Sequence, residues 1–176
     1  MAIPAAAGAD TIPGAEQVIT PPITVAAPPE APQSATPAAA KSTAAKSTKL
    51  SKAARQRIKA AKAVSVAKKQ VGDPYRWGAS GPNAFDCSGL VMYSWRKAGV
   101  KLPRITGSQY RAVKKKVSWK NLKPGDLMFF SGLGHVGMYV GHGKMIHSPR
   151  SGTRVQINKL TKYRKASFVG AVRPGI

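Results

Sequence analysis

The chain contains a single cysteine, Cys87, which follows directly after an aspartate. Residues 73–83 before it are rich in glycine and proline and are expected to form a loop. From Leu90 onward, apolar residues recur at helical spacing until Gly99, which is expected to end the helix. Asp86 is therefore the expected N-cap, and Cys87 lies in the first turn. There, free N–H groups and the helix dipole favour a thiolate and can hold an oxyanion, so the position suits a nucleophile.

A lone cysteine is more often a small buried hydrophobic side chain than a nucleophile. Two histidines favour the catalytic interpretation here. A three-residue loop between strands at 135–140 and 144–148 places Gly137 opposite His147, so that His135 and His147 are neighbours on one face. If the cysteine helix packs on that face, the thiol meets His135. The residues then have the types and order of a nucleophile, a base and a group that orients the base.

A metal site is the other common use of two histidines, but zinc needs more ligands than these. The available candidates are Cys87, Asp86 and Asp126, and none has a suggestive spacing. No metal and no cofactor are therefore predicted. His142 lies in the hairpin loop and is interpreted as a surface residue.

The pattern along the chain places helices before strands. A helix is expected from about Ile58 to Gly72, and a short helix, capped by Thr106 or Ser108, follows the cysteine helix. The strands are short and separated by glycine, at 127–130, 135–140, 144–148, 154–157 and 168–172. This order predicts an α+β domain with an antiparallel sheet of about five strands.

Charge divides the chain unevenly. All 29 basic residues lie from Lys41 onward, where only three acidic residues occur, a net of +26. Residues 1–40 are rich in proline and alanine and are predicted to be a disordered linker, with a possible signal-peptide remnant at 1–9. Residues 41–57 form a basic Lys, Ala, Ser and Thr tract, and residues 58–176 form the folded domain.

This charge predicts binding to polyanions, of which nucleic acid and the phosphate-bearing polymers of a bacterial wall are examples. No apolar run approaches the length of a membrane span. With one cysteine, an intrachain disulfide is excluded. Nucleic acid is the weaker partner because no series of aromatic residues accompanies the basic tract to stack on bases.

Several sequence blocks resemble those of the NlpC-type (NlpC/p60) cysteine peptidases. The resemblance covers residues 64–173, and its blocks lie at 73–78 (DPYRWG), 85–91 (FDCSGLV), 102–104 (LPR), 108–110 (SQY), 124–127 (PGDL) and 135–139 (HVGMY). Exported actinobacterial members that cut peptidoglycan stem peptides are the most similar in pattern. One departure is Ala79, which stands where the family usually repeats glycine.

The resemblance implies a papain-like α+β fold and cleavage between γ-D-glutamate and the diamino acid, which is diaminopimelate or lysine. It assigns Cys87 as the nucleophile that forms an acyl-enzyme, His135 as the general base and His147 as the third polar member. It also implies oxyanion binding by Tyr75. By the same resemblance, Asp86 and Ser88 contact the amine of the stem peptide.

The expected partners are therefore peptidoglycan stem peptides and anionic wall polymers, and the expected protein is a secreted monomer at the bacterial cell wall. Two alternatives remain open. One is a wall-binding or polyanion-binding module whose activity is vestigial. The other is an amidase or acyltransferase that uses the same three residues on a different bond.

Overall fold

The structure is a computed structural model that describes residues 50–176. Predictions for the linker, the signal-peptide remnant and most of the basic tract lie outside the described residues. Helix α1 (Lys52–Lys68) begins after its N-cap Ser51, whose hydroxyl accepts the Ala54 N–H at 3.1 Å. The helix thus starts before Ile58, and the last part of the predicted basic tract belongs to it.

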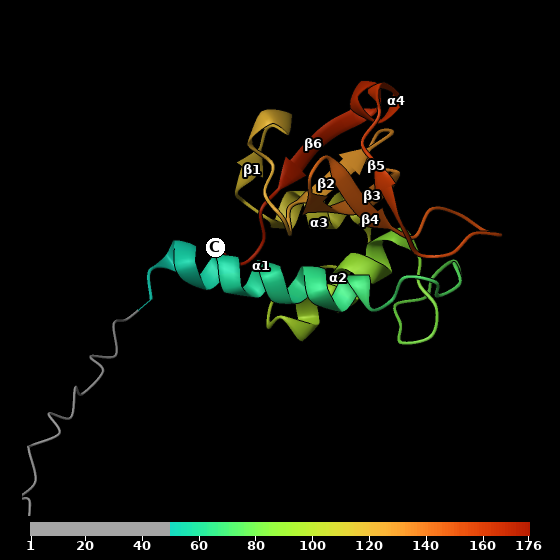
Figure 1. The fold of residues 1–176 in the computed structure, drawn as a ribbon, viewed down its shortest axis with the longest axis horizontal. Coiled ribbons are helices and arrows are strands. Elements are labelled where there is room, and N and C mark those ends of the chain that lie inside the picture. The colour runs from blue at the N-terminus through green and yellow to red at the C-terminus, as the bar shows by residue number, and fades with distance from the viewer. Residues whose placement is uncertain (1–49) are drawn as a thin grey trace, which may run out of the picture. The chain divides into compact units, whose positions relative to one another are not determined.

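The remaining elements follow in the predicted order, helices first (Figure 1). They are α2 (Cys87–Lys97), α3 (Thr106–Ala112), β1 (Lys116–Val117), the 3-10 helix η1 (Trp119–Asn121), β2 (Leu127–Phe130), β3 (His135–Gly141), β4 (Lys144–His147), β5 (Gln156–Lys159), α4 (Lys162–Ala166) and β6 (Phe168–Val172). No helix among residues 50–176 is both long and apolar enough to cross a membrane.

The strands form one antiparallel sheet in the order β1-β6-β2-β3-β4-β5. The α+β class and the antiparallel sheet are confirmed. The sheet has six strands because the two-residue strand β1 pairs with β6 at one edge, and this strand is too short to leave a periodic pattern in the sequence.

Helices α1 and α2 pack together on one face of the sheet (Figure 1). The buried residues of α1 are mostly alanines, whose small side chains let α2 and the sheet come close. Trp95 of α2 is fully buried in this core. Gly125 adjoins it, and an added Cβ there would lie 2.7 Å from the Ala60 Cβ, so only glycine fits.

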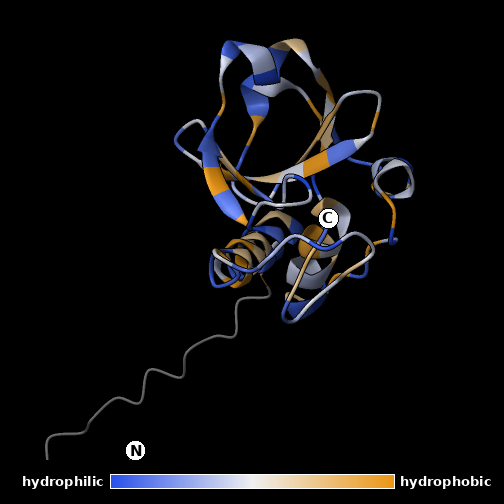
Figure 2. Ribbon diagram, turned by 90° about the vertical axis from the view of Figure 1, so that its right-hand side faces the viewer, coloured by the Kyte–Doolittle hydropathy of each residue, from blue (hydrophilic) through white to orange (hydrophobic). Residues whose placement is uncertain are grey.

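A second, smaller core covers the opposite face of the sheet. Met128, Phe130 and Met145 point into it, and residues from η1, β6 and the chain after β5 close it from outside. All four residues of β2 are buried because both of its faces are covered. Figure 2 shows the hydrophobic segments of the strands and helices gathered in the interior of the domain.

Helix α3 exists as predicted, but its predicted caps are wrong. Its N-cap is Ile105, which makes no side-chain capping bond. The helix is held instead by Gln109, whose buried amide donates to the Ser88 carbonyl at 3.0 Å and to the Pro103 carbonyl at 2.9 Å. Tertiary hydrogen bonds therefore replace a local cap.

A buried ion pair joins the end of the chain to the turn before β2. Both oxygens of Asp126 accept from the Arg173 guanidinium, at 2.8 and 2.7 Å, and one also accepts the Lys123 N–H at 2.7 Å. Asp126 has no exposed surface. The pair thus fixes β6 against the β2 turn.

Replacing Asp126 with alanine should lower the free energy of unfolding by about 3 kcal/mol, because it leaves the mostly buried Arg173 charge unpaired. Urea unfolding followed by circular dichroism measures this. Asp73→Ala is the control, since the Asp73 carboxylate makes no ion pair or hydrogen bond among residues 50–176, and its effect should be within about 0.5 kcal/mol. Equal effects of the two changes would contradict the structural importance of the pair.

Candidate active site

Asp86 caps α2 as predicted and places Cys87 at the first position of the helix. Its Oδ1 accepts the Gly89 N–H at 2.7 Å, and its backbone carbonyl accepts the Leu90 N–H at 3.0 Å. Cys87 is half-buried beside the main core, and its thiol forms no disulfide. The capped turn therefore fixes the sulfur at the point where the chain enters the core.

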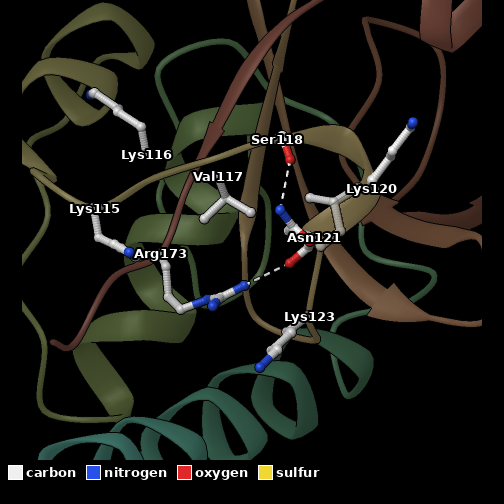
Figure 3. Close-up of a pocket in the computed structure, with 9 residues that line it drawn as sticks. Lys115, Lys116, Val117, Ser118, Lys120, Asn121, Lys123 and Arg173 are labelled. Carbon is white, nitrogen blue, oxygen red and sulfur yellow. Dashed lines mark hydrogen bonds between the residues drawn. The ribbon is translucent and has the colours of Figure 1, made fainter.

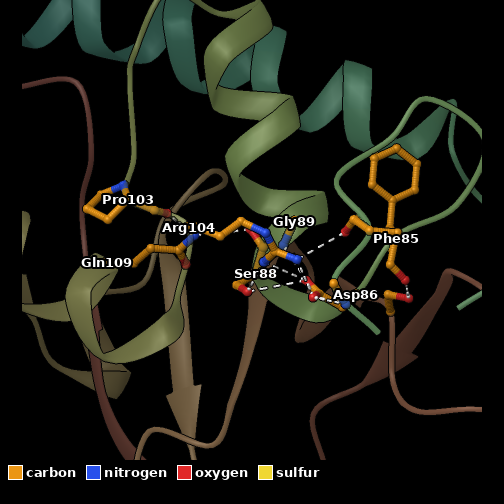
Figure 4. A network of polar contacts seen from close by, with 10 residues as sticks. Phe85, Asp86, Ser88, Gly89, Pro103, Arg104 and Gln109 are labelled. Carbon is orange, nitrogen blue, oxygen red and sulfur yellow. Dashed lines mark hydrogen bonds and ion pairs between the residues drawn. The ribbon is translucent and has the colours of Figure 1, made fainter. Parts of the chain in front are cut away.

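The carboxylate of Asp86 is also the centre of a polar network (Figure 4). Arg104 spans both oxygens, with Nη1 donating to Oδ1 at 3.0 Å and Nη2 donating to Oδ2. The Gly78 N–H donates to Oδ2 at 3.0 Å, and the Ser88 hydroxyl donates to Oδ1 at 3.2 Å. Ser88 in turn accepts from Arg104 at 2.8 Å. Asp86 is nearly inaccessible to solvent, so these groups satisfy it fully.

The loop before the helix packs directly on its first turn. A Cβ added to Gly89 would lie 2.1 Å from the Ala79 carbonyl oxygen, so no larger residue fits between helix and loop. The same carbonyl accepts the Asp86 N–H at 3.0 Å. The departure at Ala79 is accommodated here, because the loop uses its backbone and not its side chain for this contact.

The two histidines meet as the hairpin register predicts. Nε2 of His135 lies 2.8 Å from Nδ1 of His147. Met138 pairs with Ile146, which places Gly137 beside His147, and a Cβ added to Gly137 would lie 3.4 Å from the His147 Cβ. The missing side chain at Gly137 leaves space for the pair of imidazoles.

Helix α2 does not pack on the histidine face, so the condition under which the thiol would meet His135 there is not fulfilled. The helix covers the face formed by Val136, Met138 and Ile146, whereas His135 and His147 alternate with these residues and share the opposite face. The ring of His135 lies over that second core, 6.3 Å from the ring of Phe130.

Cys87 instead approaches β3 at Val136, the residue that follows His135. The pairing of β3 with β4 begins only at Met138, which leaves Val136 without a β4 partner. The Val136 N–H lies close enough to the Cys87 sulfur to lower the pKa of the thiol. Beyond β4 the chain turns to the loop before α2, where the Ser148 hydroxyl donates to the Phe85 carbonyl at 2.7 Å. Cys87 thus lies beside Val136, where β4 leaves the sheet. Val136 is the neighbour of His135 along β3.

Asn158 of β5 completes the chain of polar groups, and the sequence patterns do not point to it. Its Oδ1 lies 2.8 Å from Nε2 of His147. A carbonyl oxygen only accepts, so His147 must donate from Nε2 and accept at Nδ1. His135 then donates from its own Nε2, which leaves its Nδ1 free of a proton. Asn158 is diagonal to His147 across the β4–β5 ladder. Only a prediction of this register could have pointed to Asn158 from the sequence.

Burial controls the protonation of these groups. It lowers the pKa of His135 to about 3 and of His147 to about 4, and the positive charge of Arg164 adds to both shifts. Burial also raises the pKa of the Cys87 thiol, although the N–H groups of Val136 and of the helix N-terminus partly offset this. The expected thiolate stabilisation is therefore outweighed. The resting pair is a neutral thiol and a neutral imidazole.

A cleft of about 440 Å³ opens at Cys87. Asp86, Ser88 and Arg104 line it on the helix side, and Trp77, whose side chain is largely exposed, stands on the loop side. Tyr75 is half-buried nearby, and burial together with the charges of Cys87 and Asp86 raises the pKa of its hydroxyl. That hydroxyl therefore stays protonated and can donate a hydrogen bond.

His142 lies apart from this site. It occupies the β3–β4 turn with a left-handed φ of 51° and is exposed. Among residues 50–176, no three or more histidine, cysteine, aspartate or glutamate side chains are grouped so as to hold a metal ion. The structure thus places Cys87, Asp86 and Ser88 at one cleft, with Tyr75 close to Cys87. His135 and His147 form a pair, and His135 adjoins Val136, which Cys87 approaches. Sequence reasoning assigned no role to Arg104, Gln109 or Asn158.

Comparison with known proteins identifies the family of the chain. The NlpC/P60 family pattern matches residues 72–173, which is more than half of the chain, and the protein belongs to this family. It is 46% identical over 94 residues to the probable endopeptidase p60 of Listeria monocytogenes, covering 52% of this chain and 19% of that protein. It is 43% identical over 113 residues to the murein DD-endopeptidase MepH of Escherichia coli, covering 59% and 42% respectively.

Solved structures show the same fold. A P60 domain of an antigen from Mycobacterium avium subspecies paratuberculosis superposes with a TM-score of 0.62 at 29% identity, covering 69% of this chain and 98% of that domain. The peptidoglycan hydrolase RipB of Mycobacterium tuberculosis superposes with a TM-score of 0.60 at 31% identity, covering 68% of this chain and 66% of that protein. The chain spans only about a fifth of the length of the Listeria relatives.

The hydrogen-bond chain predicts that both histidines carry their proton on Nε2, which ¹⁵N chemical shifts of labelled protein measure directly. Asn158→Leu removes the acceptor, worth about 1 kcal/mol, and should shift the tautomer ratio of His147 about fivefold. Asn158→Asp, which keeps an acceptor of the same shape, is the control and should keep the wild-type tautomer. A proton on Nδ1 of His135 in the unchanged protein would refute the assignment.

The histidines also predict how stability depends on pH. Unfolded histidine takes up a proton as the pH falls through 6.5, whereas folded His135 and His147 stay neutral to about 3 and about 4. Below 6.5 the unfolded state therefore binds more protons, and the free energy of unfolding falls by up to about 1.4 kcal/mol per pH unit for each histidine.

Urea unfolding between pH 7 and 4.5 tests this expectation. His147→Gln should flatten the decline, because the buried titrating group is gone. His142→Asn is the matched control, since asparagine tolerates the left-handed turn and the exposed His142 ring lies outside the site. A decline that is unchanged in His147→Gln would show that other groups cause it.

Proposed function

We propose that the protein is a cysteine endopeptidase that hydrolyses peptidoglycan stem peptides. The observation that carries this proposal is the chain from Asn158 through His147 to His135, which leaves Nδ1 of His135 unprotonated. His135 is the neighbour along β3 of Val136, whose N–H lies close to the Cys87 sulfur. The names of the relatives, endopeptidases and a peptidoglycan hydrolase, support the substrate class.

In this mechanism, the Cys87 sulfur attacks the peptide carbonyl carbon while Nδ1 of His135 takes the thiol proton. Proton transfer accompanies attack because both groups rest in their neutral forms. N–H groups at the start of α2 and the Tyr75 hydroxyl stabilise the oxyanion. His135 then gives the proton to the leaving amine, and an acyl-enzyme thioester remains on Cys87.

Water completes the reaction. His135 removes a proton from the water as its oxygen attacks the thioester carbon, and the proton returns to the sulfur when the carboxylic acid leaves. Each turnover consumes one water and yields one acid and one amine. His147 takes no proton: it accepts the His135 N–H and so keeps the reactive nitrogen unprotonated.

The structure suggests a different role for Asp86 than the family resemblance implies. Its two oxygens are already occupied by Arg104, Ser88 and backbone N–H groups, and the carboxylate is buried. We infer that it positions the helix and holds Ser88 and Arg104 at the wall of the cleft. Contact with the amine of the stem peptide would then fall to Ser88 and its neighbours in the cleft.

The scissile bond proposed is the one between γ-D-glutamate and the diamino acid. MepH is named a DD-endopeptidase, so a bond between two D-centres is the competing assignment within the family. An amidase or acyltransferase would use the same three residues, and a vestigial binding module would not need them. We infer export to the cell wall from this substrate.

Cys87→Ala should abolish the release of peptides from purified peptidoglycan, and His135→Ala should lower kcat by roughly 10²–10⁴-fold. His147→Ala should give a smaller loss, because the base remains present but is no longer oriented. His142→Asn is the control and should keep full activity. Turnover by the folded Cys87→Ala variant at the wild-type rate would exclude the thiol mechanism.

Mass spectrometry of the products from defined muropeptides identifies the bond in the same experiment. Cleavage after γ-D-glutamate supports the proposed bond. Cleavage of the crosslink between D-centres supports the competing endopeptidase. Release of the whole stem peptide from the sugar would point to an amidase and would leave the thiol mechanism intact.

A further inference from the structure

Three cavities away from Cys87 join into one groove. The first, of about 420 Å³, is lined by β1, η1, the following turn and Arg173 (Figure 3). The second, of about 510 Å³, shares Lys115 and Arg173 with the first. The third, of about 720 Å³, lies against the N-terminal part of α1 and shares Lys101 and residues 175–176 with the second. Shared lining residues make the three cavities neighbours on the surface, and together we call them the basic groove.

Arg173 in the basic groove is paired with Asp126, but the charge of the lysines there is not compensated. None of the lining residues of the groove is acidic. Among residues 50–176 the two ion pairs are Arg104 with Asp86 and Arg173 with Asp126, so the lysines of the groove have no acidic partner. In Figure 3, Lys115, Lys120 and Lys123 stand around the first cavity together with Arg173.

Such a concentration of like charge costs free energy unless an anion neutralises it. The crowding is visible at Lys116, whose pKa is lowered by burial and by the positive charge of Lys114. A groove that runs past three cavities suits a linear anion with repeated charges better than a single phosphate ion.

We propose that the basic groove binds a linear phosphodiester polymer of the alditol-phosphate type, as found in anionic bacterial wall polymers. Lysine presents a strongly hydrated point charge, which suits separate phosphates along a flexible chain. In the middle cavity, Leu102 and Val113 offer apolar contact to the carbon backbone of such a polymer. No aromatic side chain lines any of the three cavities, so the stacking that single-stranded nucleic acid requires is missing.

The groove and the catalytic cleft lie on either side of one segment. Pro103 lines the middle cavity of the groove, and the next residue, Arg104, lines the cleft at Cys87. No residue lines both. A polymer in the groove would therefore hold the protein against the wall while leaving the cleft open. This binding does not depend on the chemistry at Cys87 and can be tested without it.

The test uses the full chain with Cys87→Ala, so that hydrolysis plays no part, and purified poly(glycerol phosphate) as the probe. The groove variant carries Lys101→Gln, Lys115→Gln and Lys120→Gln, which are exposed and hold no hydrogen bond through their side chains among residues 50–176. The control variant carries Lys62→Gln, Lys68→Gln and Lys144→Gln, three exposed lysines that line none of the three cavities.

Both variants lose the same charge and keep residues 1–49, so they differ only in where the lysines lie. The groove variant should bind about tenfold more weakly at low salt, and its affinity should depend less steeply on salt. The control variant should bind nearly as tightly as the parent. Equal losses in the two variants would overturn the groove as a site and show that charge acts from the whole surface.

Two further measurements decide the ligand and the independence of the groove. Oligodeoxythymidylate with the same number of phosphates should bind more weakly than poly(glycerol phosphate), and equal or tighter binding would overturn the assignment to a wall polymer. With Cys87 restored, the groove variant should cleave a small soluble stem peptide at the rate of its parent. A large fall in that rate, at unchanged melting temperature, would overturn the separation of groove and cleft.

Discussion

The carboxylate of Asp86 is the contact on which the geometry of the site depends. It caps α2, receives the loop before the helix through the Gly78 N–H, and binds Arg104 on its other side. Because Cys87 is the next residue, any movement of this carboxylate moves the sulfur. The close approach of the loop at Gly89 and the bond from Gln109 to the Ser88 carbonyl restrict the same turn. Cys87 therefore lies on a segment held from three directions.

His135 is held by a different part of the fold. Asn158, His147 and His135 come from three adjacent strands, so the sheet register sets their spacing. The Cys87 sulfur approaches β3 at Val136, next to His135 and beyond the end of the β3–β4 pairing. The site thus depends on the fit between a capped helix and a strand end, and the main core that packs α2 against the sheet maintains it.

Local patterns in the sequence predict the parts of this arrangement that are local. Asp86 as N-cap, the hairpin and the pairing of His135 with His147 all follow from spacing over a few residues. The face on which α2 packs does not, because helix periodicity fixes which residues are buried but not which side of the sheet they cover. Asn158 and β1 were missed for a related reason: one is an ordinary polar residue in an edge strand, and the other is two residues long.

The protonation state of the Cys87 thiol could not be predicted from the sequence either. It shows that a strongly basic protein can contain a site whose groups are neutral. The helix N-terminus favours a thiolate, yet burial and the negative charge of Asp86 raise the pKa of Cys87, and burial lowers that of both histidines. Arg164 acts in the same direction as burial on the imidazoles. At rest no charge is therefore held in the cleft by these three groups. In the proposed mechanism, negative charge would develop on the substrate oxygen where cations are already in place. These cations would then favour the reacting state more than the resting one.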